Sequence, residues 1–146
     1  MAQCSMQKVI NDVFTFYEAN VAPAYAYLVA ITGEKPIQVL VEIENAFAHL
    51  SQSVKGENVQ ANIDKAYNHL VRLYIDLYKL LLVEVKKISE KRNIILDLSF
   101  IKLTKEAREY EINHVGNADS IPIVGSKYAK AINVALSGLG LDQINS

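Results

Sequence analysis

The sequence contains few of the residues that cross-link a chain or interrupt its helices. Cys4 is the single cysteine, so no disulfide can form within the chain, and a reducing compartment suits it. No catalytic motif accompanies Cys4, and we interpret it as incidental. There is no tryptophan, and the 146 residues include only three prolines and six glycines. Because these two residues break helices, their scarcity favours long helices.

Long apolar runs are also absent. A membrane-spanning helix needs about 20 apolar residues, whereas the most apolar stretch, 21–31, is shorter and contains Pro23. Residues 1–12 lack the basic and apolar regions of a secretory signal. A net charge of −1 argues against wholesale binding to nucleic acid or to anionic lipid. We therefore expect a soluble, cytoplasmic protein that does not associate with membranes.

What the sequence does contain is apolar residues at steps of three and four, the mark of amphipathic helices. These steps predict helices over 6–21, 24–31, 37–54, 58–92, 99–114 and 124–136, with a kink at Pro23 between the first two. Residues 93–99 are interpreted as a linker or a turn of helix. We predict an all-α fold, a single up-down helical bundle of about five helices with one long central helix. One domain, 1–146, accounts for the whole chain.

The helix over 37–54 has an apolar stripe that we predict to face the core. Gly56 is expected to end this helix as a left-handed cap. The stripe consists of Ile37, Leu40, Ile43, Phe47, Leu50 and Val54.

The helix over 58–92 is the most informative element, with Asn58 as its expected N-cap. At about 1.5 Å per residue it would be about 50 Å long, far more than the typical 11–12 residues. Either it spans the bundle as a central helix, or one end projects and packs against a second copy, making the chain a homo-oligomer through this helix. The apolar run 80–83 must be buried on several sides. Its stripe, at nearly a 3.5-residue period, consists of Ile63, Tyr67, Leu70, Tyr74, Leu77, Leu81, Val85 and Ile88.

Histidines are scarce, and the sequence predicts neither a metal site nor a cofactor. His49 and His69 lie on neighbouring helices, where a pair of imidazoles can bind a metal. A zinc site needs three or four ligands, however, and no HxxxH or ExxH spacing supports this pair.

Two polar surfaces and a group of tyrosines leave alternatives open. The stripe Asp64, His69, Arg72, Asp76 and Lys79 is either a solvated face with ion pairs along the helix or a polar recognition surface. The basic residues Lys86, Lys87, Lys91, Arg92, Lys102, Lys105 and Arg108 either keep a helix end soluble or hold an RNA backbone. Tyr25, Tyr27, Tyr67, Tyr74 and Tyr78 either pack as amphipathic residues or line a small-molecule pocket.

Arg108 and His114 are the candidate catalytic residues. A histidine can transfer protons at the 2′-hydroxyl or at the leaving oxygen of RNA, and an arginine can stabilise the charge on the phosphate. Six residues apart on an ideal helix, the two side chains would point about 120° away from each other. They would converge only if the helix ended before His114 or if two subunits each contributed a residue.

In its helical architecture and its Arg108-x5-His114 motif, the chain resembles HEPN domains. These are small all-α bundles with an Arg-x4–6-His motif near the end of a later helix. The resemblance implies a metal-independent ribonuclease of the toxin or defence type, with Arg108 and His114 in a composite site at a dimer interface. Other HEPN domains lack the motif and serve as non-catalytic partners.

The function that the sequence favours is that of a helical interaction or regulatory module that self-associates. The HEPN-like ribonuclease, with RNA as its partner, is the alternative, and a small-molecule sensor is the third hypothesis.

Overall fold

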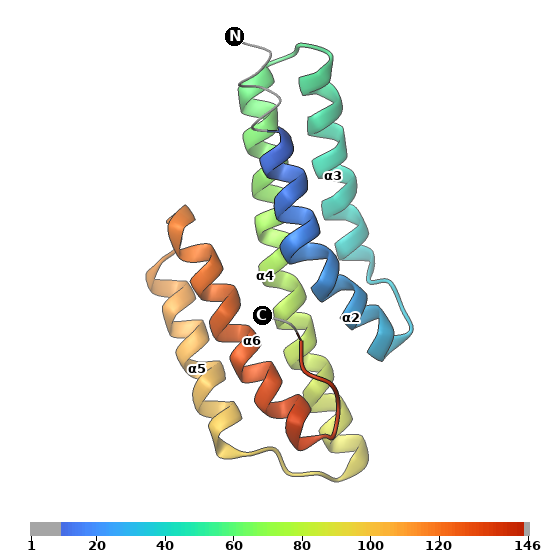
Figure 1. Ribbon diagram of the computed structural model, residues 1–146, viewed down its shortest axis with the longest axis vertical. Helices are drawn as coiled ribbons and strands as arrows, with labels where there is room; N and C mark the ends of the chain where they lie inside the picture. Colours follow the sequence, from blue (N-terminus) through green and yellow to red (C-terminus); the bar gives the residue numbers. More distant parts are fainter. Residues whose placement is uncertain (1–9, 145–146) are drawn as a thin grey trace. The chain divides into compact units, whose positions relative to one another are not determined.

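The computed structural model describes residues 10–144, apart from the side chain of Ala118 (Figure 1). All regular elements in this range are helical, and none of the described residues lies in a strand. The prediction of an all-α bundle with one long central helix is therefore confirmed. In this part of the chain, no helix is both long enough and apolar enough to cross a membrane. Cys4, the segment 1–9 and the first residues of the helix predicted over 6–21 lie outside the described residues.

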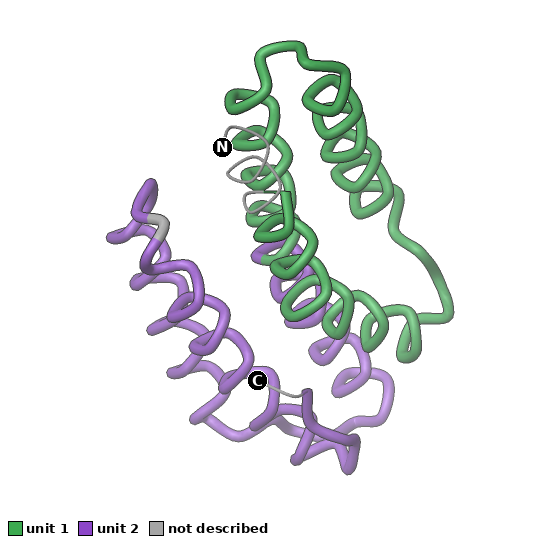
Figure 2. The backbone as a smooth tube through the Cα atoms, turned by 45° about the horizontal axis from the view of Figure 1, so that its top comes forward, with its two compact units in different colours: residues 1–74 green, residues 75–146 purple. Residues whose placement is uncertain are grey.

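The chain divides into two compact units, Met1–Tyr74 and Ile75–Ser146 (Figure 2). The boundary lies inside α4, Val59–Arg92, a continuous helix of 34 residues. No glycine or proline marks this boundary in the sequence, because the backbone remains helical across it. The helix predicted over 58–92 is thus one element that contributes to both units.

The apolar stripe that predicted α4 is covered by the chain itself. Ile63, Leu77 and Leu81 are fully buried. Within the apolar run 80–83, Leu81 and Leu82 are buried and Val83 is 46% exposed. This burial agrees with the first of the two explanations, in which the long helix serves as the centre of the bundle.

Unit 1 begins with a helix, residues 10–16, that passes through a π-helical turn, Tyr17–Val21, into α2, Ala22–Thr32. Pro23 lies in the first turn of α2, where a missing N–H costs least. Just before it, the N–H of Ala22 donates to the carbonyl of Tyr17, five residues back. A single π turn lets a helix absorb an irregularity without ending. Near the kink expected at Pro23, the structure has this π turn, and the chain remains helical through the proline.

The helix α3, Ile37–Val54, begins after Pro36 and is followed by Gly56 at φ 85°, as the sequence predicted. Its orientation differs from the prediction. Ile37, Phe47 and Val54 are 79%, 64% and 71% exposed, and Leu40 is 45% exposed. The face that α3 buries consists of Val39, Ala46, Leu50 and Ser53.

Of the predicted stripe, Leu50 is buried as expected and Ile43 is half-buried. The prediction was wrong for the other four residues, because this helix has more apolar positions than one face can bury. Val39 and Ala46 are small enough for the helix to lie close to its neighbours. The larger side chains of Ile37 and Phe47 are left on another face. Periodicity reveals an apolar stripe, but it does not say which of two stripes the chain covers.

Unit 2 pairs α5, Leu98–Asn113, with α6, Ile121–Gly138, which pack side by side (Figure 1). Asp97 caps α5 by accepting a hydrogen bond from the backbone N–H of Ser99 over 2.8 Å. Phe100 and Ala107 of α5 are buried. Ile101, the residue after Phe100, lies outside the buried face and is 61% exposed.

Candidate functional site

Arg108 and His114 lie near the C-terminal end of α5. Arg108 is exposed and lines a groove with Ile101, Thr104 and Ile112 of the same helix. His114 is the C-cap residue, and its backbone has left the helical conformation, with φ −122° and ψ 20°. Among the described residues, no hydrogen bond joins the two side chains. Arg108 therefore lies on α5 and His114 just beyond its end, without a hydrogen bond that connects them within the described part of one chain.

His114 is held in a fixed orientation. Its Nδ1 lies 2.7 Å from the backbone oxygen of Tyr110, and because a carbonyl oxygen only accepts, Nδ1 carries the proton. The imidazole stacks on the Tyr110 ring, with centroids 3.8 Å apart and planes 17° apart. Lys127 Nζ lies 5.1 Å from the centroid of the Tyr110 ring. These contacts leave Nε2 of neutral His114 as a proton acceptor.

Glu111 organises the buried polar contacts beside these residues. Its Oε1 accepts from Lys79 Nζ over 2.6 Å, and its Oε2 accepts from the hydroxyl of Tyr128. Tyr128 is fully buried. Burial, the hydrogen bond to Glu111 and the charge of Glu111 all raise the pKa of Tyr128, and the charge of Arg108 offsets part of the rise. Tyr128 therefore stays neutral and acts as a structural donor.

The residues Lys79 and His69 of the predicted polar stripe on α4 are not simply solvated. Lys79 pairs with Glu111 of α5, and His69 pairs with Glu42 of α3. Arg72 is exposed, and Asp64 accepts a hydrogen bond from Gln60 over 3.0 Å. Two of the five stripe residues thus connect helices within a unit, a role that the sequence spacing did not reveal.

A pair of histidines in unit 1 forms the other organised polar cluster. His49 of α3 and His69 of α4 have ring centroids 5.3 Å apart and planes 16° apart. His69 Nδ1 lies 2.6 Å from Glu42 Oε2, and His49 Nδ1 lies 2.9 Å from Asn62 Oδ1. The sequence placed the two histidines on neighbouring helices but identified neither of these partners, because the contacts bridge separate helices.

The hydrogen bonds determine the tautomers of both histidines. Asn62 is buried and donates from Nδ2 to the Glu57 carbonyl over 2.7 Å, which leaves its Oδ1 as the acceptor. His49 therefore donates from Nδ1, and His69 donates likewise to the carboxylate of Glu42. In the neutral rings, both Nε2 atoms remain acceptors. Among the described residues, no group of three or more histidines, cysteines or acids is arranged to hold a metal ion.

The tyrosines named in the sensor hypothesis differ in their surroundings. A cavity of about 490 Å³ in unit 1 is lined by Tyr67 together with Asp12 and Phe16. Burial and the charge of Asp12 raise the pKa of Tyr67. Tyr74 and Tyr78 are buried, and Tyr74 packs edge-on against Phe16 with centroids 5.5 Å apart. Tyr74 is therefore a packing residue, which was the first of the two interpretations of the tyrosines.

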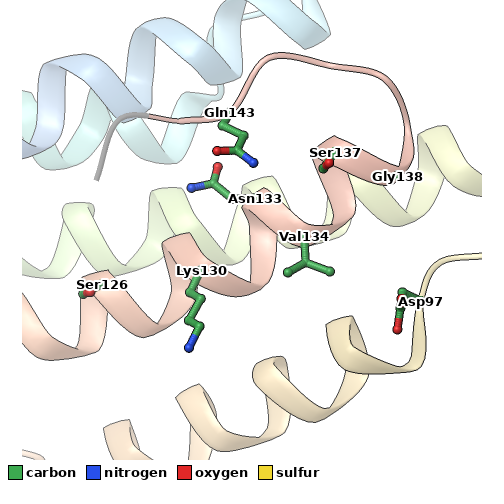
Figure 3. A pocket seen from close by; sticks show the side chains of 8 residues that line it. All are labelled: Asp97, Ser126, Lys130, Asn133, Val134, Ser137, Gly138 and Gln143. Carbon is green, nitrogen blue, oxygen red and sulfur yellow. The ribbon is translucent and has the colours of Figure 1, made fainter.

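The groove on α6 in unit 2 is larger, at about 700 Å³ (Figure 3). Figure 3 shows Lys130 and Asn133 on α6, and Asp97 at the start of α5. Asn133 holds the C-terminal segment: its Nδ2 donates to the Ile144 carbonyl over 3.1 Å, and its Oδ1 accepts from the Ile144 N–H over 2.7 Å. This side chain is therefore satisfied by the backbone and has a structural role.

A third groove, of about 320 Å³, lies along α5. Its walls are largely apolar, from Phe100, Ile101 and Ile112, and its rim includes Lys86, Lys105 and Arg108. It combines an apolar floor with a charged rim, to which Glu109 also contributes, and one of the two predicted catalytic residues, Arg108, lines it. Comparison of the chain with protein-family models, curated proteins and solved structures found no match.

Proposed function

We propose that this protein is a helical interaction module that self-associates, and that the exposed stripe of α3 is its contact surface. The observation that carries the proposal is the exposure of Leu40, Phe47 and Val54, at 45%, 64% and 71%. These residues are separated by seven positions each, the repeat that brings one side of a helix against a partner helix. An exposed apolar surface of this kind marks an interaction site.

The proposal moves the contact surface away from the long helix. Leu81 and the other central residues of the α4 stripe are already buried within the chain, so they have no apolar surface left to offer. On α3, the stripe offers Phe47, an aromatic side chain of the type that dominates the energy of protein interfaces. Association through α3 therefore requires no rearrangement of the core.

Sedimentation of two matched variants tests the proposal. We expect the wild-type protein to form a dimer or larger species at micromolar concentration, and Phe47→Glu to shift it to the monomer. Gln52→Glu introduces the same charge at an exposed position of the same helix and should leave association unchanged. A wild-type protein that sediments as a monomer at high concentration would overturn the proposal.

We propose a HEPN-like, metal-independent ribonuclease as the second candidate function. It is supported by the hydrogen bond from His114 Nδ1 to the Tyr110 carbonyl, which leaves Nε2 ready to accept a proton. The exposed guanidinium of Arg108 on the same helix suits a phosphate. Cleavage of single-stranded and structured RNA by the wild type, and not by His114→Ala, is the direct test.

A further inference from the structure

The second exposed apolar stripe of the chain lies on α5. Leu98, Ile101 and Ile112 are 80%, 61% and 71% exposed, and Val115, just beyond the helix, is 81% exposed. Between Ile101 and Ile112 the same side of the helix carries Lys105 and Arg108. We define the α5 stripe as Leu98, Ile101, Lys105, Arg108 and Ile112.

The α3 stripe has the same spacing and the opposite charge. We define it as Leu40, Glu44, Phe47, Ser51 and Val54, residues at steps of four, three, four and three. The α5 stripe, followed from Ile112 back to Leu98, has the same steps. Lysine and arginine are absent from α3, which carries Glu42 and Glu44. When the two stripes are aligned in this order, the apolar residues at their ends lie opposite each other. The acid Glu44 then lies opposite the base Arg108.

We propose that the partner of the α3 stripe is the α5 stripe of a second copy of this chain, packed antiparallel. In this register Leu40 lies opposite Ile112, and Val54 lies opposite Leu98. Glu44 lies opposite Arg108, which places a carboxylate against a guanidinium. This inference rests on the proposed self-association and names the surface that completes it.

The antiparallel direction follows from the order of the residues along the two stripes. A parallel pairing with matching steps would start with Leu40 opposite Ile101 and would bring Glu44 opposite Lys105. Val54 would then lie opposite Val115, beyond the end of α5 at Asn113. The antiparallel pairing instead gives Glu44 the guanidinium of Arg108, whose planar fork suits bidentate contact with a carboxylate. Lys105, the other base of the stripe, already lies 3.7 Å from a carboxylate oxygen, Oε1 of Glu109 on its own helix.

The groove along α5 provides a place for Phe47. It is lined by Ile101, Lys105, Arg108 and Ile112 of the stripe and has a volume of about 320 Å³. A cavity of about 150 Å³ is enough to bind benzene, so the groove has room for a phenylalanine ring. In the antiparallel register Phe47 lies opposite Lys105, next to this groove. Its ring would be covered by apolar walls and would lie beside the bases Lys105 and Arg108, a setting that also favours cation–π contact.

A charge exchange tests the pairing. We expect Glu44→Arg and Arg108→Glu each to raise the dissociation constant for self-association at least tenfold, measured by analytical ultracentrifugation. The variant with both substitutions in one chain should recover an affinity within a few-fold of the wild type, because the exchanged pair again joins opposite charges. Lys102→Glu makes the same charge change at an exposed position elsewhere on α5 and should have little effect.

The outcomes separate this inference from the proposed function. A monomeric wild type contradicts both. Association that Phe47→Glu disrupts, but that Ile112→Glu and Arg108→Glu leave unchanged, contradicts the pairing with α5 and preserves self-association through α3. Failure of the double charge exchange to restore the affinity lost in either single variant also overturns the pairing. Circular dichroism of each variant confirms that the helices remain folded.

Discussion

Nδ1 of His69 on α4 lies 2.6 Å from Oε2 of Glu42 on α3, and this contact joins two helices of unit 1 across 27 residues of sequence. His49 repeats the arrangement farther along α3, with Asn62 of α4 as its acceptor. Two polar links of this kind determine which faces of α3 and α4 meet, because each imidazole satisfies a specific acceptor. They help to explain why α3 keeps Phe47 outside.

Replacing Glu42 by alanine tests the contribution of this link. Loss of the acceptor leaves Nδ1 of His69 without its partner, and we expect the free energy of unfolding to fall by about 1 kcal/mol. The loss stays modest because both side chains retain 19% exposure to solvent. Urea unfolding followed by circular dichroism measures the change. Gln52→Ala, an exposed substitution on the same helix, serves as control, and an equal midpoint for both variants would contradict the prediction.

The raised pKa of Tyr128 predicts a loss of stability at alkaline pH. In the unfolded chain the phenol ionises near its ordinary pKa of 10.0, whereas in the folded chain its pKa is higher. The unfolded state therefore releases this proton first as the pH rises, and stability that is fully present below pH about 10 declines above it. Urea midpoints between pH about 8 and about 11 should fall less steeply for Tyr128→Phe than for the wild type.

The same substitution also has an effect at neutral pH. Tyr128→Phe removes the hydroxyl that donates to Glu111 and leaves a partly buried carboxylate oxygen with one partner fewer. We expect a loss of about 1–3 kcal/mol in unfolding free energy. Tyr17→Phe, at a partly exposed position in unit 1, is the control. Identical pH profiles for Tyr128→Phe and the wild type would mean that this phenol does not titrate differently on unfolding.

Sequence periodicity predicted the helices well and their orientation less well. The stripe of α4 was long enough, with residues from Ile63 to Ile88, to identify both the helix and its buried side. On α3, by contrast, two overlapping sets of apolar residues compete, and the covered set contains the small Val39 and Ala46. Packing against other helices decides which of the two sets is buried. The sequence of one helix alone does not give this information.

For the candidate sites, too, the sequence identified residues but not their contacts with other helices. Arg108 and His114 were identified from the chemistry of their side chains and from their spacing near the end of one predicted helix. The partners of His49, His69 and Lys79 lie on other helices, at separations of 13 to 32 residues. Only the packing of helices brings these groups together. The α5 groove was missed for the same reason, since Lys86 of α4 and Ile112 of α5 both line it.

A comparison of Leu81 with Phe47 distinguishes a core residue from a surface residue. Leu81 is fully buried, so Leu81→Ala should cost about 2–5 kcal/mol of stability by leaving a cavity. Phe47→Ala removes a side chain that is 64% exposed and should change the stability of the monomer by less than about 1 kcal/mol. Thermal unfolding at low protein concentration measures both. A larger loss for Phe47→Ala than for Leu81→Ala would contradict the assignment.

Asn133 should control the order of the C-terminal segment. Its amide makes two hydrogen bonds with the backbone of Ile144, and Asn133→Ala removes both. We expect the Ile144 amide hydrogen to exchange with solvent several-fold faster, because its acceptor is lost. Amides in the middle of α6 should keep their exchange rates. Hydrogen exchange followed by NMR gives the answer, with Ser137→Ala, an exposed change on the same helix, as control.

The ribonuclease proposal makes the most demanding prediction, because it requires His114 to act as a proton acceptor. If Nε2 of His114 takes a proton from the 2′-hydroxyl of RNA, His114→Ala should lower the cleavage rate by about 10²–10⁴-fold. Arg108→Gln should lower the cleavage rate as well, since it removes the charge that stabilises the phosphate.

Chelation of divalent ions should leave the cleavage rate unchanged, because the proposed mechanism uses no metal. His49→Gln, which changes a histidine of unit 1, and Lys65→Gln, which removes an exposed base of unit 1, are the matched controls. Cleavage that persists in His114→Ala, or that falls equally in His49→Gln, would show that the activity does not come from this pair.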